Sequence, residues 1–359
     1  MFKGSASGAV IMMIVQLEAF FGGGYFPVDD ADGFIGVILK FSPLRKTNDA
    51  IDWNCIRFIQ LSDTITYKIE TETTGSYLLR IHSERVNKEE ILSELVFLNG
   101  LRKVQDLVVP EGIQSRCGSY ILECETEEWY RKPYVTLMRW VEGEHWSSEF
   151  TDSHVYNIGA MIGRLHKASA NLDTPVDFVR PHWGSDSFRQ EVAKLERYYP
   201  RFLSDSSWKL YQKAIDKIIH QFDRMQRDAR NYGLIHADLH SGNVVFNNGH
   251  PFPVDFGRCG YEFYLYDMSG ALLELTPKHR WLLIQGYESV VKLNKDYIRD
   301  LECFFIMTMI ENYCHHSSDM REIPSLIEEQ KYALAYINEY INDRTFLFEV
   351  IEAVDTELI

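Results

Sequence analysis

The 359-residue sequence lacks the cysteine pairs that mark structural zinc sites and redox centres. Its six cysteines include no Cys-x-x-Cys pair and are scattered along the chain, at Cys55, Cys117, Cys124, Cys259, Cys303 and Cys314. Scattered thiols are typical of proteins from a reducing compartment. The cysteine pattern therefore predicts a cytoplasmic protein without a thiolate metal site.

Positive charge is also scarce. The chain carries 37 Lys and Arg against 52 Asp and Glu, for a formal net charge of −15. Such an acidic balance argues against a general nucleic-acid-binding protein, because binding to phosphate backbones requires basic surfaces. It is compatible with a cationic substrate.

Long apolar runs are missing as well. Residues 8–21 are mostly apolar, but Gln16 and Glu18 interrupt them and the run is too short to span a bilayer. Three glycines at 22–24 would then break a helix. We therefore expect no membrane partner, and residues 1–50 are an N-terminal extension to which the sequence assigns no role.

One stretch of the chain, residues 234–275, concentrates chemically active side chains. Two apolar runs, 244–246 and 252–254, flank the polar segment 247–249, and this pattern predicts a β-hairpin. Asp238 and Asn243 would then lie on the loop that enters the hairpin, and Asp255 would lie where it ends.

These residue types suit phosphoryl transfer. A carboxylate such as Asp238 can orient a hydroxyl nucleophile and accept its proton, which makes it the candidate catalytic base. Mg²⁺ prefers oxygen ligands, and Asn243 and Asp255 can supply them. The spacing from Asp238 to Asn243, followed by Asp-Phe-Gly, is that of the protein-kinase catalytic loop, although Ala237 stands where kinases have arginine.

The segments HADLHSGN and VDFG resemble the aminoglycoside phosphotransferase and choline kinase family. The run DFGRCGYEFYLYDMSGAL is similar to bacterial members related to homoserine kinase type II. The resemblance implies a two-lobed, protein-kinase-like α+β fold that binds ATP and Mg²⁺ between its lobes. We expect a small antiparallel β N-lobe over residues 51–141 and a larger, mainly helical C-lobe over residues 142–359.

Three short strands are predicted at 56–61, 65–70 and 76–81. In a kinase-like lobe the turn between the first two covers the nucleotide phosphates. This turn has no glycine-rich loop, so Ser62 and Thr64 are candidate phosphate ligands, or the turn is a plain hairpin connection.

The third strand contains Arg80, at the place where kinases have a lysine that holds the α- and β-phosphates. A helix follows, with Asn87 as its expected N-cap. The resemblance makes Glu94 in this helix the candidate partner of Arg80, with Glu90 as the alternative.

The strand predicted at 134–141 would lead into the segment between the lobes. Its last residues are the candidates for contact with the adenine ring, Met138, Arg139, Trp140 and Val141. The alternative is an ordinary edge strand, and the two interpretations are compatible.

Most of the remaining chain has helical periodicity, including 208–227 and 281–294. We interpret His166 as a buried structural histidine, and Asp267 as a helix N-cap. In similar proteins an aspartate at this place supports the catalytic loop. Glu311, with the neighbouring pair His315 and His316, could face the substrate.

The sequence thus predicts an ATP-dependent phosphotransferase that acts on a hydroxyl of a small, amine-bearing molecule. The candidate phosphate acceptors are an amino alcohol, a homoserine-like compound and an aminoglycoside. The alternatives are a Ser/Thr protein kinase of the same fold and a catalytically silent pseudokinase. The sequence does not assign an oligomeric state.

Overall fold

The computed structural model describes residues 56–61, 64–71, 74–83, 85–123, 133–145 and 151–354. The chain divides into two compact units. The small unit comprises Met1–Lys103, Val108–Glu142 and Asp173–Val179, and the large unit comprises Val104–Leu107, Gly143–Leu172 and Arg180–Ile359. The expectations for residues 1–50 and for Ser62 lie outside the described residues.

The small unit contains an antiparallel sheet in the order β1-β2-β3-β6-β4, with β5 also paired to β6. Its strands are β1 (Ile56–Leu61), β2 (Thr64–Thr71), β3 (Gly75–His82), β4 (Glu111–Gly112), β5 (Ile121–Glu123) and β6 (Tyr134–Arg139). The three predicted N-terminal strands are confirmed. Buried side chains such as Ile65, Leu79 and Val135 form the core of this sheet.

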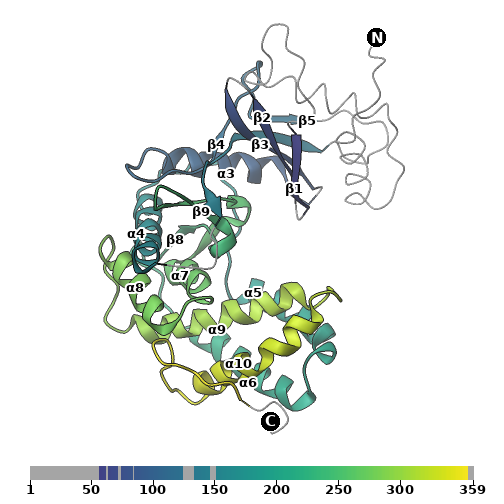
Figure 1. Cartoon of the computed structure of the whole chain (residues 1–359), viewed down its shortest axis with the longest axis vertical. Coiled ribbons are helices and arrows are strands. Elements are labelled where there is room, and N and C mark those ends of the chain that lie inside the picture. The colour runs from purple at the N-terminus through teal and green to yellow at the C-terminus, as the bar shows by residue number, and fades with distance from the viewer. Residues whose placement is uncertain are drawn as a thin grey trace. The chain divides into compact units, whose positions relative to one another are not determined.

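Helix α3 (Lys88–Leu101) packs beside this sheet (Figure 1). The Glu90 amide donates to Asn87 Oδ1 at 2.7 Å, and the Asn87 amide donates to Glu90 Oε2 at 3.2 Å. This reciprocal capping box confirms Asn87 as the N-cap. It also engages Glu90 at the helix start, which leaves Glu94 as the helix carboxylate that can reach Arg80.

The large unit is mainly helical, with a central helix α9 (Figure 1). Its helices are α4 (Asp152–Ser169), α5 (Ser185–Tyr198), α6 (Asp205–Phe222), α7 (Tyr264–Leu272), α8 (Pro277–Glu288), α9 (Tyr297–His316) and α10 (Ile323–Ile341). Every residue of α9 from Leu301 to Met307 is buried. A helix that is buried on all sides forms the middle of a core, and α5, α6, α7 and α10 all contact α9.

Two predicted helices have different bounds in the structure. The segment predicted at 208–227 is α6, which begins at Asp205 because the Ser204 side chain caps it, and which ends at Phe222. The segment predicted at 281–294 is α8, which begins at Pro277 after the N-cap Thr276. Proline suits the first turn of a helix, where no amide donor is needed.

Short strands and 3₁₀ turns form the segment that contains Asp238, Asn243 and Asp255, which we call the motif residues. Strands β8 (Tyr232–Ile235) and β11 (Gly260–Phe263) form one pair, and β7 (Glu144–His145), β9 (Val244–Asn247) and β10 (His250–Pro253) form a second sheet. The 3₁₀ turns are η3 (Tyr199–Arg201), η4 (Ser241–Asn243) and η5 (Phe256–Arg258). The predicted hairpin is confirmed as β9–β10, and Asn248 and Gly249 both have positive φ, as a tight hairpin turn requires.

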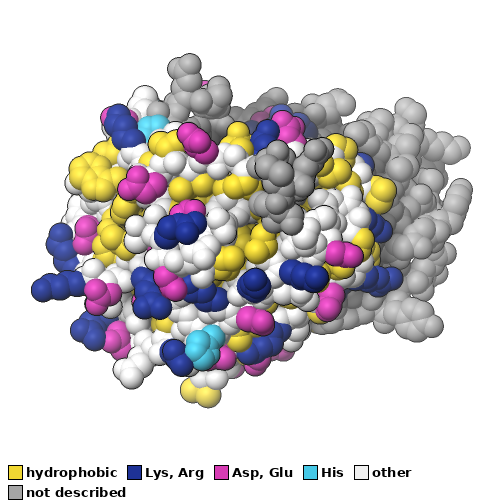
Figure 2. All heavy atoms as spheres, turned by 90° about the horizontal axis from the view of Figure 1, so that it is seen from below, with side chains coloured by type: hydrophobic (Ala, Val, Ile, Leu, Met, Phe, Trp, Pro, Cys, Tyr) yellow, Lys and Arg dark blue, Asp and Glu magenta, His cyan; other side chains and the backbone are white. Residues whose placement is uncertain are grey.

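Within the described ranges, none of the helices has both the length and the apolar character needed to cross a membrane. On the face of the molecule in Figure 2, acidic and basic side chains are interspersed rather than separated by sign.

Candidate active site

Asp238 and Asn243 are joined directly. Asp238 follows β8, and Asn243 closes the turn η4 just before β9. The Asn243 side-chain amide donates to the Asp238 carbonyl at 2.8 Å and to Asp238 Oδ2 at 3.1 Å. Asn243 is buried and Asp238 is half-buried, and Asn243 holds one oxygen of the Asp238 carboxylate in place.

Asp255 lies two residues after the end of β10, in a left-handed conformation with φ 60°. The preceding residue, Val254, donates its amide to the Asn243 carbonyl at 2.9 Å. The Val254 carbonyl accepts from His236 Nε2 at 2.8 Å, and the His236 ring packs 4.4 Å from the ring of Phe256. The hairpin therefore brings the Asp255 segment back to the loop that carries Asp238 and Asn243.

Helix α7 supports this loop through a buried carboxylate. Asp267 Oδ2 accepts from the His236 amide at 2.8 Å, and Asp267 Oδ1 accepts from the Ala237 amide at 2.7 Å. Ala237 has φ 63°, a conformation that non-glycine residues adopt at a cost and that its surroundings must hold. A Cβ at Gly270 would lie 2.8 Å from the Leu239 carbonyl oxygen, so only glycine permits this approach of helix and loop.

The prediction that Asp267 is a helix N-cap is wrong. The N-cap is Phe263, and α7 begins at Tyr264, so Asp267 lies inside the first turn. Its oxygens accept from the backbone amides of His236 and Ala237 instead of from the helix amides. This arrangement matches the supporting role that the family resemblance implied.

His166 is a buried structural histidine, as predicted. Its Nε2 lies 3.1 Å from Asp267 Oδ2, and its Nδ1 lies 3.1 Å from the Tyr287 hydroxyl. The ring also stacks on Tyr264 with centroids 4.6 Å apart. Because both nitrogens are engaged with partners inside the fold, His166 orients Asp267 rather than a ligand.

Arg180 and Trp183 hold the Asp-Phe-Gly turn, and sequence reasoning missed both. Arg180 donates from Nε to the Cys259 carbonyl at 2.5 Å and from Nη2 to the Gly257 carbonyl at 2.6 Å. Trp183 Nε1 donates to the Arg258 carbonyl at 3.1 Å. Both precede the motif by a long stretch of sequence and belong to no recognisable local pattern, so nothing in the chain signals their contact with it.

In the small unit, Arg80 and Glu94 form a buried ion pair. Arg80 Nη1 donates to Glu94 Oε1 at 2.5 Å, and both side chains are almost fully buried. The expected contact is thus present, and it fixes the orientation of the guanidinium. Thr64, the first residue of β2, is buried, and its hydroxyl lies 3.4 Å from that of Thr66.

The four candidate adenine contacts differ in their surroundings. Strand β6 pairs with β3 on one side and β4 on the other, so Met138 and Arg139 have strand neighbours on both sides. The Trp140 amide donates to the Ser76 carbonyl at 3.0 Å. Contact with adenine stays a prediction for all four residues.

Glu311, on α9, lies in a polar cluster that extends to Asp238. Glu311 Oε2 accepts from the Tyr266 hydroxyl at 2.6 Å, and burial raises the pKa of its carboxyl to about 7. The charge of Arg258 opposes this shift of Glu311, and the charge of Asp238 acts on Arg258 in turn. Burial lowers the pKa of His315, and the charge of Asp238 opposes that shift. Groups from α7, α9 and the Asp-Phe-Gly turn therefore share one electrostatic environment with Asp238.

Comparison with known proteins identifies the family of the chain. A model of the phosphotransferase enzyme family matches residues 58–290. The chain is 28% identical over 153 residues to the amicoumacin kinase of Bacillus subtilis (strain 168), a match that covers 42% of this chain and 41% of that protein. The alignment thus spans about two fifths of the length of this curated relative.

Solved structures show the fold. An amicoumacin kinase in complex with AMP-PNP, Ca²⁺ and Ami superposes with a TM-score of 0.71 at 17% identity, covering 91% of this chain and 96% of that one. A microcompartment-associated aminopropanol kinase superposes with a TM-score of 0.69 at 22% identity, covering 80% and 92%. The predicted α+β, kinase-like fold is confirmed.

Proposed function

Because the chain belongs to the phosphotransferase enzyme family, we propose that it transfers the γ-phosphate of ATP to a hydroxyl of a small, amine-bearing molecule. The observation that carries this proposal is the joining of Asp238, Asn243 and the Asp255 segment by the hairpin. A reducing, cytoplasmic setting fits the four free cysteines of the described residues.

Asp238 is the proposed base. Its carboxylate would accept the proton of the acceptor hydroxyl as the hydroxyl oxygen bonds to the γ-phosphorus and the bond to the bridging oxygen of ADP breaks. Asn243 holds Oδ2 of this carboxylate, and the support of Asp267 fixes the backbone before it. Catalysis would then consist mainly of positioning and charge stabilisation.

The donor set fits a hard cation that arrives with the nucleotide. No cluster of three or more His, Cys, Asp or Glu side chains among the described residues could hold a metal ion. Mg²⁺ commonly uses one or two protein oxygens together with phosphate oxygens and water. Asn243 directs its NH₂ group toward Asp238, which leaves its amide oxygen for such a cation, and Asp255 would supply the second oxygen. Bound Mg²⁺ would neutralise charge on the phosphates.

Residues of the small unit would bind the nucleotide. Arg80, oriented by Glu94, is proposed to hold the α- and β-phosphates, with Thr64 and Ser62 near the phosphates. The adenine ring of the nucleotide is proposed to contact the segment from Met138 to Val141.

The amine preference rests on the polar cluster around Glu311. The half-buried Glu311 carboxylate shares its environment with Asp238 and is a suitable partner for an ammonium group beside the reacting hydroxyl. The similar proteins include one named amicoumacin kinase and one named aminopropanol kinase, and these names support a small, amine-bearing acceptor.

The test is ADP release with a panel of amino alcohols, sugars and aminoglycosides. Asp238→Asn should lower turnover with the best acceptor by about 10²-fold or more, because the general base is lost, while nucleotide binding is retained. The matched control is Asp173→Asn, which alters an exposed carboxylate. Unchanged turnover in Asp238→Asn would rule out the base assignment.

A protein kinase of the same fold is the second candidate. Ala237 replaces the arginine that reads a phosphorylated activation segment, and only η5 and β11 separate Asp255 from α7. Both features favour a small acceptor. Phosphate transfer to generic protein acceptors at a rate above that for every small molecule would reverse this preference.

A further inference from the structure

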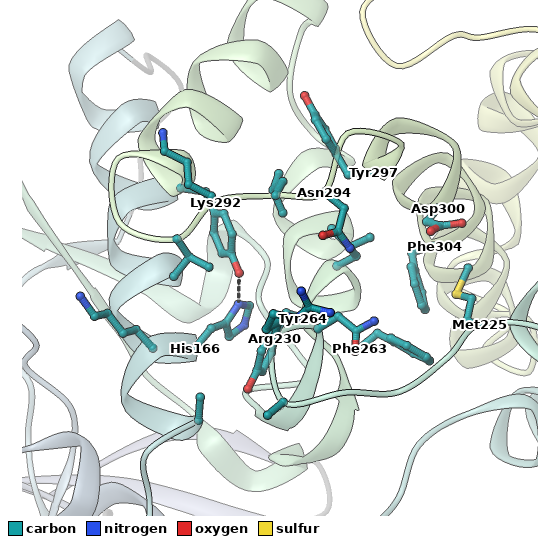
Figure 3. Close-up of a pocket in the computed structure, with 18 of the residues that line it drawn as sticks. His166, Met225, Arg230, Phe263, Tyr264, Lys292, Asn294, Tyr297, Asp300 and Phe304 are labelled. Atoms are coloured by element: carbon teal, nitrogen blue, oxygen red, sulfur yellow. Dashed lines mark hydrogen bonds between the residues drawn. The ribbon is translucent and has the colours of Figure 1, made fainter.

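The large unit contains a cavity of about 320 Å³ that is separate from the motif residues. It lies between the end of α4, residues 225–231, the start of α7, residues 291–294 and the first half of α9 (Figure 3). None of Asp238, Asn243 and Asp255 lines it. The volume is at the lower end of the range for small-molecule sites.

The inner wall of the cavity is aromatic. Phe263, Tyr264, Tyr287 and Phe304 all line it, and each of these side chains is almost fully buried in the fold. Rigid aromatic walls bind flat apolar bodies at little cost in side-chain entropy. The Tyr264 hydroxyl is directed away from the cavity, against Gly233, so it is the ring of Tyr264 that belongs to the wall.

Charged side chains of both signs line the cavity: the lysines Lys167 and Lys292, and the acid Asp300. In Figure 3, Lys292 lies across the cavity from Asp300 and Phe304. Lys167 and Lys292 are exposed, and the structure records no ion pair for either of them among the residues it describes. Arg230, by contrast, is paired with Asp228 at 2.5 Å. Two lysines are thus available on the rim for an anionic group.

From these features we propose that the cavity binds a small organic anion with an aromatic body, such as an aryl carboxylate. The ring would pack against Tyr264 and Tyr287, and the carboxylate would meet Lys167 and Lys292. Asp300, on the opposite side, sets the orientation because it repels the anionic end.

The position of this site gives it a structural link to the motif loop. His166 and Tyr287 line the cavity and are joined by a hydrogen bond. His166 also contacts Asp267. Asp267 in turn holds the amides of His236 and Ala237. A bound ligand would therefore contact the support of the loop and not the loop itself. Binding can be measured without any assumption about phosphoryl transfer.

The test is a ¹⁹F NMR titration of the full chain with 3-(4-fluorophenyl)propionate, with the neutral 3-(4-fluorophenyl)propionamide as the matched ligand. We expect saturable binding of the acid, with the amide bound about tenfold more weakly because it lacks the charge. Lys292→Met should weaken binding of the acid about threefold, and Lys167→Met combined with Lys292→Met about tenfold, with little change for the amide.

Two further variants separate the cavity from the rest of the surface. Ala229→Phe places a large side chain at an exposed position of the cavity lining and should abolish binding of both ligands. Lys213→Met removes an exposed lysine of α6 outside the cavity and should leave binding unchanged. Circular dichroism verifies that each variant is folded.

The proposal is overturned by any of three results. The first is no saturable binding of the acid. The second is equal affinity for acid and amide, which would remove the anion assignment. The third is unchanged affinity in both Ala229→Phe and the double lysine variant, which would place the ligand elsewhere.

Discussion

At the scale of single residues, the setting of Asp238 comes from neighbours of two kinds. Asn243 holds one carboxylate oxygen at 3.1 Å, and this contact follows from the loop spacing that the sequence displays. The charge of Asp238 also acts on Arg258 and His315, and Glu311 belongs to the same environment. The spacing from Asp238 to Asn243 can be recognised in the sequence. The charged neighbours of Asp238 cannot, because they depend on packing between distant segments.

Glu311 should give the proposed reaction a pH dependence. Burial raises its pKa to about 7, so the carboxyl is neutral below that pH and ionised above it. For amine-bearing acceptors, kcat/KM should therefore rise as pH increases through about 7. Glu311→Gln should remove this rise and lower kcat/KM at pH 8 about tenfold or more, since a charged hydrogen bond contributes about 1.5–3 kcal/mol.

Neutral acceptors provide the internal comparison, because they make no ion pair with Glu311. Glu196→Gln, at an exposed position on α5, is the control variant. An equal loss for neutral and amine-bearing acceptors in Glu311→Gln would show that the residue acts through the structure of the site and not through recognition of the amine.

At the scale of elements, the hairpin β9–β10 and helix α7 hold the motif loop from two directions. The hairpin was predictable because alternating apolar runs and an Asn-Gly turn are local signals. The start of α7 was not, because Phe263 has no side chain that can cap a helix and Asp267 offered a plausible cap. The actual role of Asp267 depends on a backbone segment 30 residues away in sequence. Arg180 escaped prediction for the same reason.

Asp267→Asn tests this support. Asparagine keeps one acceptor oxygen but turns an NH₂ group toward a backbone amide that needs an acceptor, and a buried donor without a partner costs about 1–3 kcal/mol. We expect a loss of this size in the free energy of unfolding, measured by urea denaturation, together with a lower kcat. Asp216→Asn, on the exposed face of α6, should change neither. Wild-type stability and kcat in Asp267→Asn would contradict the supporting role.

At the scale of the whole molecule, two carboxyls with raised pKa values, one fully buried and one half-buried, link stability to pH. Glu262 is fully buried, its Oε2 has no hydrogen-bond partner among the described residues, and burial raises its pKa from 4.5 to about 8. Burial of Glu311 raises its pKa to about 7. Between pH 4.5 and these values the folded protein binds more protons than the unfolded chain, so the free energy of unfolding decreases as pH rises.

We therefore expect stability to fall from about pH 5 to about pH 8 through these two groups, and Glu262→Gln to make that fall shallower. One proton accounts for a slope of about 1.4 kcal/mol per pH unit, which bounds the effect of the substitution. Urea denaturation at several pH values measures the slope. If the variant and the wild type lose stability in parallel over this range, Glu262 does not titrate as its burial implies.

The central position of α9 limits how far the chain can be shortened. The family match stops at residue 290, before this helix begins at Tyr297. Yet α5, α6, α7 and α10 all pack around α9. A fragment trimmed to the matched region would retain every motif residue and lose the scaffold that keeps α7 in place, so we expect it to aggregate rather than to act as a minimal enzyme.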